Sequence, residues 1–350
     1  MKIAIDLSAS ISGGGLLVAS QLLKYIEKYK NEHFYVIFIN SSTYKQFEKH
    51  PNINFIQLKK RYGLISEIFN QIKIKRLLVT EKCEVFFCPN NYCIQHNRKI
   101  KKVFMIQDSN IFNFHKPIVE TRNKVRYFIL YLLYRISLKN TNEVIFNNKY
   151  LHKQGKTIYL GVDHIKKCKV NNKKYDICTI ISNEERYKNV ELIFNALKMS
   201  KINLSMIIIG EIKKESNVAI ISNMNAKVET IGNLNYEEIA EIISHSRLFV
   251  STSLWESFSF PPFEAIINEI PILLSDIEIY RELWGDFPIY FDPYSPESLA
   301  VKIEDVFKNY DKYGKISFEL KRLTTQLTWK NFGDNLFSIL EKEKEENDDN

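Results

Sequence analysis

The sequence predicts an α/β protein with two domains, each built on a parallel, doubly wound sheet. Its length of 350 residues corresponds to about two average domains. Short apolar runs alternate with helical segments through both halves of the chain, and the basic, polar run at residues 166–174 is typical of a linker between compact units. We therefore expect one domain over residues 1–165, a second over residues 166–328, and a separate last helix within residues 329–350.

In the first half, short apolar runs predict strands and longer periodic segments predict helices. The strands are expected at residues 2–7, 35–39, 54–58, 84–88, 103–106 and 143–146, and the helices at residues 16–29, 64–78 and 122–139. Three glycines, Gly13 to Gly15, separate the first strand from the first helix. Because the free N–H groups of a helix start attract anions, Gly14 and Gly15 are candidates for anion binding, with a plain turn as the alternative.

The second half repeats this alternation. Its strands are expected at residues 176–181, 205–209, 228–232, 248–251, 272–275 and 289–292, and helices are expected to open after Asn189 and Ser295 and to cover residues 236–246 and 331–344. Between two of these strands, Pro261 and Pro262 open a further predicted helix, residues 262–267, because proline is tolerated in a first helical turn.

Two carboxylates flank that proline pair with the spacing E-x7-E. Glu256 is expected in the loop after the strand, and Glu264 in the first turn of the helix. Both would then face the crevice beyond the carboxyl end of a parallel strand, where open α/β sheets bind ligands. The alternative is a solvated acidic helix start, which the helix dipole favours.

This stretch resembles the signature of the retaining nucleotide-sugar glycosyltransferases of family 4, which have the GT-B fold of two Rossmann-like domains facing across a cleft. The matching residues are Ser253, Glu256, Phe258, Pro261, Glu264, Ala265 and Pro271. The chain departs from the signature at Ser257, Ser259 and Glu269, where the family usually has glycine. The resemblance extends over most of residues 157–332 and implies that the last helix packs back on the N-terminal domain.

The resemblance also implies roles for individual residues. Glu264 would accept both hydroxyls of the nucleotide ribose, and Glu256, as the catalytic carboxylate, would hold the donor sugar. The backbone N–H groups of Ser259 and Phe260 would meet the sugar or the diphosphate. No acidic D-x-D motif is present to bind a metal, so we expect no metal or other cofactor. Fixed cations must then stabilise the departing diphosphate, and the candidates are Arg186 and Lys188.

Gln107 and Asp108 end a predicted strand where many relatives have His-Asp near the reacting sugar. A glutamine amide can bond a sugar hydroxyl but cannot take a proton at pH 7, so we expect no base role for Gln107. Asp108 would either orient an acceptor hydroxyl or cap a turn. In the family, the leaving phosphate oxygen is thought to receive the acceptor proton, so the reaction does not require a base here.

The charge of the chain is uneven. Residues 1–165 hold 26 Lys/Arg and 11 Asp/Glu (+15), whereas residues 166–350 hold 23 and 30 (−7). Two predicted helices of the first half are basic and apolar, and the first carries Lys73, Lys75 and Arg76. Such helices either lie on an anionic bilayer or are core helices with a solvated basic edge. No nucleic-acid motif accompanies the charge, so nucleic acid is not expected as a partner.

Five cysteines without a zinc spacing indicate reduced thiols and a cytoplasmic protein, and no apolar run is long enough for a transmembrane helix. Together with the resemblance, these features predict a hexosyltransferase-type enzyme, peripheral on the cytoplasmic face of the membrane. It would pass a sugar, with retention, from a nucleotide-diphosphate sugar to a hydroxyl of a lipid-linked glycan in O-antigen, lipopolysaccharide or capsule biosynthesis. The alternatives are a sugar-nucleotide epimerase of the same fold and a non-catalytic scaffold.

Overall fold

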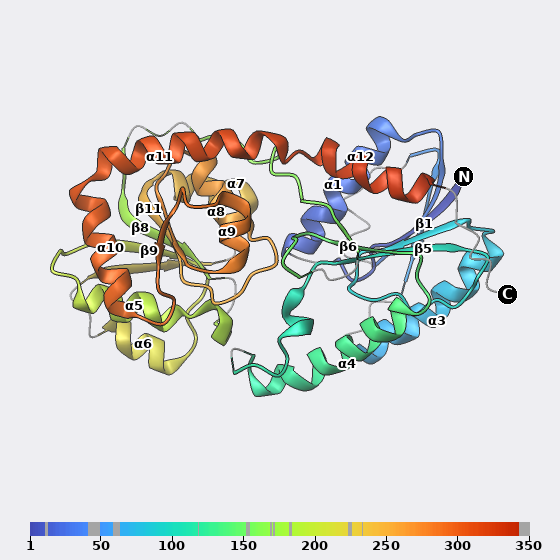
Figure 1. The fold of residues 1–350 in the computed structure, drawn as a ribbon, viewed down its shortest axis with the longest axis horizontal. Helices are drawn as coiled ribbons and strands as arrows, with labels where there is room; N and C mark the ends of the chain where they lie inside the picture. Colours follow the sequence, from blue (N-terminus) through green and yellow to red (C-terminus); the bar gives the residue numbers. More distant parts are fainter. Residues whose placement is uncertain are drawn as a thin grey trace. The chain divides into compact units, whose positions relative to one another are not determined.

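In the computed structural model, the chain forms two units, each a parallel sheet covered by helices (Figure 1). Unit 1 comprises Met1–His115, Thr121–Gly161 and Leu327–Asn350, and unit 2 comprises Lys116–Glu120 and Val162–Gln326. The structure describes residues 1–10, 13–40, 50–58, 64–117, 119–151, 155–168, 170, 172–181, 184–222, 226–232 and 234–342, without the side chains of residues 64–67, 122 and 236.

The sheet of unit 1 has, among the described residues, seven parallel strands in the order β3-β2-β1-β4-β5-β6-β7. The strands are β1 (Lys2–Asp6), β2 (Phe34–Ile39), β3 (Ile53–Gln57), β4 (Val85–Cys88), β5 (Lys101–Ile106), β6 (Glu143–Phe146) and β7 (Lys156–Thr157). In the register, Ile3 pairs with Tyr35 on one side and with Val85 on the other. The chain proceeds from β1 toward one edge and from β4 toward the other, so the topological switch point lies between β1 and β4.

Among the residues that the structure describes, four helices cover the two faces of this sheet. Because parallel crossovers are right-handed, α3 (Leu64–Thr80) and α4 (Thr121–Leu138) lie on one face and α1 (Gly13–Tyr29) lies on the other, where α12 (Trp329–Glu341) packs against it (Figure 1). The helix expected at residues 16–29 thus begins at Gly13. Gly14 and Gly15 are therefore part of its first turn and do not form a separate turn before it.

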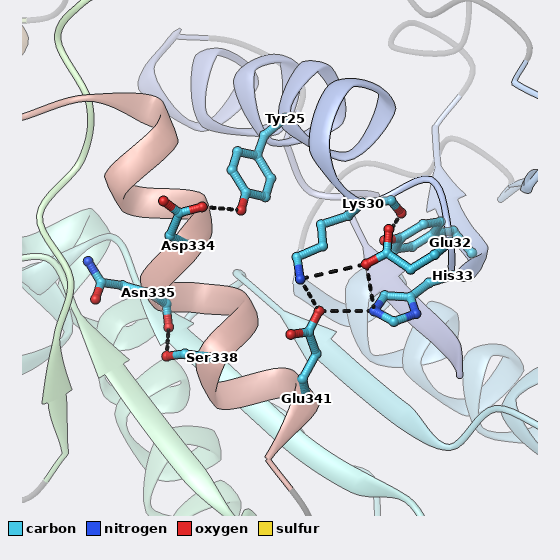
Figure 2. A network of polar contacts seen from close by, with 9 residues as sticks. Tyr25, Lys30, Glu32, His33, Asp334, Asn335, Ser338 and Glu341 are labelled. Carbon is cyan, nitrogen blue, oxygen red and sulfur yellow. Dashed lines mark hydrogen bonds and ion pairs between the residues drawn. The ribbon is translucent and has the colours of Figure 1, made fainter.

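The last helix, α12, joins unit 1 through close and specific contacts. Gly333 lies so near the Tyr25 ring that any Cβ would collide with it, and the Tyr25 hydroxyl donates to Asp334 at 2.6 Å. Near the end of the helix, Glu341 accepts hydrogen bonds from Lys30 and His33 (Figure 2). Shape and charge therefore both fix this helix on α1.

Unit 2 repeats the topology of unit 1 with, in its described part, six parallel strands in the order β10-β9-β8-β11-β12-β13. They are β8 (Tyr175–Ile180), β9 (Ser205–Ile209), β10 (Lys227–Ile231), β11 (Ser246–Ser251), β12 (Ile272–Ser275) and β13 (Ile289–Phe291). The switch point lies between β8 and β11, which pair through Leu248 and Ile177. Residues after β11 are therefore placed where such sheets bind ligands.

Right-handed crossovers place the helices of unit 2 on both faces of its sheet. One face carries α5 (Val190–Met199), α6 (Glu215–Ser222) and α10 (Pro296–Lys308), and the other carries α7 (Tyr236–Ser244), α8 (Phe260–Ile267) and α9 (Glu278–Trp284), with α11 (Tyr310–Leu323) packed against α8. The core between the sheet and α5 and α10 is built from Ile, Leu, Val and Phe side chains such as Phe194, Leu248 and Ile303. This core holds β8 and β11 rigidly behind the loop that follows β11.

Candidate functional site

The loop after β11, residues 252–259, is tied to the one-turn helix η2 (Arg186–Lys188) by two hydrogen bonds. The backbone N–H of Leu254 donates to the Tyr187 carbonyl at 2.7 Å. The Thr252 hydroxyl donates to the Lys188 carbonyl at 2.9 Å. These bonds hold two segments more than sixty residues apart in sequence against each other at the carboxyl end of the sheet.

Lys188 and Glu256 meet at this junction. The Lys188 Nζ lies 2.6 Å from Oε1 of Glu256, and the two side chains are only 16% and 13% exposed. The Ser253 hydroxyl donates to the same Oε1 at 2.8 Å. A charged pair so far removed from water interacts more strongly than an exposed one, so the junction presents a fixed cation beside a fixed carboxylate. The structure thus brings together two of the residues that the sequence singled out.

Arg186 takes a different direction from Lys188. Its side chain is exposed, and Nη1 lies 3.5 Å from the Pro117 carbonyl oxygen. It lines a polar pocket at the start of α5 together with Glu184, Glu185, Asn189, Lys214 and Asn217. Its predicted part in phosphate binding stays a prediction.

Helix α8 begins at Phe260, two residues earlier than expected, with Pro261 and Pro262 in its first turn. Glu264 is consequently the fifth helical residue, so its expected place in the first turn was wrong. Its side chain is 3% exposed. The start of the helix is held by aromatic packing, since the Phe258 ring lies 5.4 Å from Phe260 and 5.1 Å from Phe263, centroid to centroid.

Two residues at the ends of α8 have positive φ, and both stand where the related family usually has glycine. Ser259, just before the helix, has φ 67° and ψ 94°, and Glu269, just after it, has φ 57°. Ser257, the third departure from the signature, is not among the residues with positive φ. A residue with a Cβ is destabilised by about 1–2 kcal/mol when its φ is positive. The backbone is therefore strained at Ser259 and Glu269, the two positions where the family usually has glycine. At Glu269 the ammonium groups of Lys167 and Lys321, 2.6 and 3.0 Å away, supply an attraction that glycine cannot provide.

Tyr280, on α9, is a residue of this site that the sequence analysis missed. Its side chain is fully buried, and its hydroxyl lies 2.8 Å from Ser251 Oγ and 3.4 Å from Ser259 Oγ. Burial raises the pKa of its phenol, and the nearby charge of Glu256 raises it further. No local sequence signal marks Tyr280, because its contacts join three separate elements.

The carboxyl end of the unit 1 sheet carries Gly15, Gln107 and Asp108. The Gln107 Oε1 would lie 3.9 Å from a Cβ added at Gly15, and Gln107 Nε2 donates to the Pro89 carbonyl at 2.9 Å. Asn91, which the sequence analysis overlooked, accepts the backbone N–H groups of Gln107 and Asp108 at 2.7 and 2.9 Å. Gly14 lies beside Gly15 in the first turn of α1.

Asp108 caps the 3₁₀ helix η1 (Ser109–Phe112) by accepting the Asn110 N–H at 3.0 Å. This is one of the two roles expected for it. Burial raises the pKa of its carboxyl, although the bonds from Asn110 and Tyr127 and the charge of Arg126 oppose that rise.

Asp6, at the end of β1, is a third residue that the sequence analysis missed. It is fully buried and accepts hydrogen bonds from the Ser8 hydroxyl at 2.6 Å and from Gln71 Nε2 at 2.5 Å. Gln71 belongs to α3 and also accepts from Gln95 Nε2 at 3.1 Å. Burial raises the pKa of Asp6 in spite of these bonds. The switch point of unit 1 is therefore a hydrogen-bonding edge, and it is tied directly to α3.

The predicted membrane-contact residues Lys73, Lys75 and Arg76 are all exposed on α3. In the part of the chain that the structure describes, every helix is too short or too polar to cross a bilayer.

Among the described residues, one group could hold a metal by its geometry, namely Glu32, His33 and Glu341. The Lys30 ammonium donates to Glu341 there, so this group already has a cation and anchors α12 (Figure 2).

Residues 162–320 match the family model described as Glycosyl transferases group 1. The serotype-specific mannosyltransferase WbdA of Escherichia coli is 27% identical over 89 residues, 25% of this chain and 11% of that protein. The chain thus spans about a tenth of the length of the first curated relatives it matches. An uncharacterized glycosyltransferase of Methanocaldococcus jannaschii is 21% identical over 340 residues, 91% of each chain.

Solved structures resemble the whole chain. HepE of Anabaena, solved in complex with UDP-glucose, aligns with a TM-score of 0.73 and 14% identity over 97% of this chain and 99% of that one. WaaG, a glycosyltransferase involved in lipopolysaccharide biosynthesis, aligns with a TM-score of 0.72 and 12% identity over the same shares. The chain therefore has the two-sheet α/β architecture of GT-B glycosyltransferases, and its residues 162–320 match the glycosyl transferases group 1.

Proposed function

We propose that this protein is a retaining, metal-independent glycosyltransferase of family 4 that transfers a hexose from a nucleotide-diphosphate sugar to a hydroxyl of a lipid-linked glycan. The observation that carries the proposal is the Lys188–Glu256 pair beside the start of α8, at the carboxyl end of a central strand. A nucleotide-diphosphate sugar has an anionic diphosphate, which a lysine can bind, and a sugar rich in hydroxyls, which a carboxylate can bind. The named relatives support a role in surface polysaccharide or lipopolysaccharide synthesis.

In this proposal, Lys188 binds the diphosphate of the donor, with Arg186 as a second cation. The acceptor oxygen forms the new bond to the anomeric carbon while the bond from that carbon to the phosphate oxygen breaks. The leaving phosphate oxygen receives the acceptor proton on the same face, so the stereochemistry is retained. Developing negative charge on the diphosphate is stabilised most by a cation that is fixed before the reaction. The bonds that tie η2 to the loop after β11 provide that fixation.

The sugar and the ribose of the donor are bound by two carboxylates and by the first N–H groups of α8. The residues are Glu256, Glu264, Ser259 and Phe260. Glu256 would accept hydroxyls of the sugar, and Glu264 would accept the vicinal diol of the ribose, which two carboxylate oxygens match. The N–H groups at the start of α8 would donate to the sugar or the diphosphate. Gln107 and Asp108 supply amide and carboxyl groups to the acceptor hydroxyl, and no base role is assigned to either.

Donor binding is the first test. Thermal unfolding should be measured with UDP, GDP and ADP and with their sugars, because a tight ligand raises the unfolding temperature. Glu264→Gln, which conserves volume, should weaken the nucleotide that stabilises the wild type by about tenfold, the value of a strong hydrogen bond to a charged group. Glu304→Gln, on α10, is the matched control. Equal affinity in both variants would remove the ribose role, and release of free or epimerised sugar without acceptor would favour an epimerase.

The second part of the proposal is peripheral contact with an anionic membrane through α3 and α4. Both helices lie on one face of unit 1, and the segment after β4 bonds to both. Cys93 N donates to Ser137 on α4 at 2.7 Å, and Gln95 donates to Gln71 on α3. The α3–α4 surface consists of the exposed apolar residues Phe69, Ile72, Val79, Val125, Phe128, Leu132 and Ile136 and the exposed cations Lys73, Lys75, Arg76, Arg126 and Arg135.

This surface has the two properties that interfacial binding requires. Its apolar side chains recur at helical spacing, so they form a stripe along each helix, and cations flank each stripe. The sequence of α4 contains no acidic residue. Because Gln71 of α3 bonds Asp6 at the end of β1, a membrane bound at this surface would lie on a helix that contacts the proposed acceptor edge. A lipid-linked acceptor fits that arrangement, and we place the protein on the cytoplasmic face.

Liposome sedimentation tests the surface. Replacing Lys73, Lys75 and Arg76 together by glutamine should reduce binding to phosphatidylglycerol vesicles strongly, since each cation near an anionic surface contributes about 1 kcal/mol. The matched control replaces three exposed lysines of unit 2, Lys201, Lys213 and Lys227, and removes the same charge. Equal loss in both triple variants, or none in either, would reject the α3–α4 surface as the membrane site.

A further inference from the structure

The loop between Glu256 and α8 is held in a conformation that serine rarely adopts. Ser259 has φ 67° and ψ 94°, and its hydroxyl makes no capping bond to the helix that it precedes. Such a conformation persists only where surrounding contacts impose it. The contact available to the Ser259 side chain is the Tyr280 hydroxyl, 3.4 Å away.

Tyr280 is itself rigidly placed. Its ring is fully buried on α9 and lies 5.5 Å from the Trp284 ring, centroid to centroid. Its hydroxyl also contacts Ser251 Oγ at 2.8 Å, at the last residue of β11. The Tyr280 hydroxyl thus contacts one serine hydroxyl before the loop, that of Ser251, and one at the end of the loop, that of Ser259. The phenol also lies close enough to Glu256 for the charge of that residue to raise the pKa of Tyr280.

We propose that Tyr280 is a positioning residue for the donor: its hydroxyl holds Ser259 in the left-handed conformation and so fixes the first N–H groups of α8. The inference rests on the proposed function, because it assigns these N–H groups to donor binding. It also explains how the chain keeps a serine where the related family usually has glycine. Glycine adopts this conformation without a partner, whereas serine here uses the hydroxyl of Tyr280.

A cycle of four proteins tests this: wild type, Tyr280→Phe, Ser259→Gly and the double variant. Tyr280→Phe should weaken binding of the donor probe, UDP-glucose or GDP-mannose, by about fivefold, the value of one neutral hydrogen bond. In the Ser259→Gly background the same change should cost less than about twofold, because coupling is lost when one partner is absent. Ser259→Ala, which keeps the Cβ and removes the hydroxyl, should behave like Tyr280→Phe.

Tyr310→Phe is the matched control, since it removes a hydroxyl that donates to the Arg247 carbonyl at 2.8 Å in the same unit. It should leave donor affinity unchanged. A merely structural role for Tyr280 would lower affinity equally with Ser259 or glycine at position 259. That result, or full affinity in Tyr280→Phe, would overturn the inference.

Urea unfolding of the same four proteins without ligand tests the contact itself. Tyr280→Phe should lower the unfolding midpoint more with Ser259 present than with glycine, and equal shifts would contradict the contact. The two failures are distinguishable. If none of the nucleotides or their sugars binds the wild type, the proposed function falls and the positioning role falls with it. If the wild type binds and the cycle shows no coupling, only the role of Tyr280 falls.

Discussion

Apart from the extra strand β7 of unit 1, the two described sheets have the same strand order, yet their carboxyl ends carry different polar groups. In unit 2 the switch point presents a charged pair, Lys188 and Glu256, 2.6 Å apart. In unit 1 it presents Asp6 and Asp108, whose pKa values are raised by burial, beside the amides of Asn91 and Gln107. A charged edge suits an anionic donor, and a hydrogen-bonding edge suits the hydroxyl of an acceptor. The strand order therefore determines where a binding site can form, and the residues of the loops at the carboxyl ends of the strands determine what it can bind.

The largest expected effect comes from removing the cation of the charged edge. Lys188→Ala should lower the transfer rate about 100- to 1000-fold, because a preorganised group that stabilises transition-state charge contributes about 3–4 kcal/mol. The comparable change at the other edge, Gln107→Ala, should lower it only about fivefold, as for one neutral hydrogen bond. Rates are to be measured with the donor found by thermal unfolding.

Lys227→Ala is the control for that experiment, because Lys227 is an exposed lysine of unit 2 that pairs with Glu229 at 2.7 Å. It should retain the wild-type rate. If Lys188→Ala is no slower than Gln107→Ala, the proposal that the charged edge of unit 2 contributes more to the transfer rate than the edge of unit 1 is wrong. If both variants retain full activity in cells, a non-catalytic role gains support.

Unit 1 has two buried lysines among its described residues, Lys101 and Lys102, and we infer that Lys101 serves stability. Lys101, 7% exposed on β5, donates to the carbonyls of Ile339 and Lys342 at the end of α12, the latter at 2.6 Å. A cation at a helix C-terminus interacts favourably with the helix dipole and satisfies its last carbonyls. Lys101→Met should lower the free energy of unfolding of unit 1 by about 2 kcal/mol, the upper range for a partly buried charge at a helix end.

Urea unfolding measures this change, and Lys99→Met is the control, because Lys99 is exposed nearby in the sequence. Donor binding should be unaffected by Lys101→Met, since the change lies in unit 1. A variant that loses donor affinity while keeping its stability would show that Lys101 and Lys188 do not have separate roles.

Much of the fold was predictable, because buried parallel strands appear in the sequence as apolar runs. β6, β9 and β12 have the bounds that were expected. Helix starts were less certain: the expected start of α1 missed Gly13 and that of α8 missed Phe260, since glycine and proline at a first turn are also loop signals. The proximity of Lys188 to Glu256 could be anticipated only from the resemblance.

The remaining parts of the site depend on contacts that no local pattern encodes. The partners of Tyr280 lie 21 and 29 residues away in sequence, and Asp6 and Gln71 are separated by 65 residues. The departures from glycine at Ser259 and Glu269 were visible in the sequence. The positive φ of these two residues could not be predicted from the sequence, because it depends on the contacts that hold the two ends of α8.

The smallest expected effect concerns Glu269 of unit 2, whose contribution to stability depends on pH with the opposite sign to that of Asp6 in unit 1. Hydrogen bonds from Lys167 and Lys321 hold the pKa of Glu269 below its usual value of 4.5. A lowered folded-state pKa adds stability that is complete above the unfolded-state pKa and is lost as the pH falls through the folded-state value. The raised pKa of Asp6 has the opposite sign, since its contribution is complete below 3.8 and is lost as the pH rises.

Glu269→Gln should therefore lower the free energy of unfolding at pH 7 by less than about 1 kcal/mol, because the pairs are partly exposed. The difference from wild type should vanish as the pH falls below 4.5. Glutamine keeps the positive φ, so backbone strain cancels in this comparison. Glu319→Gln removes an exposed i,i+3 pair with Arg322 and is the control. Urea unfolding between pH 7 and pH 3 gives the slopes, and a difference that grows toward low pH would show that Glu269 is not stabilised by its lysines.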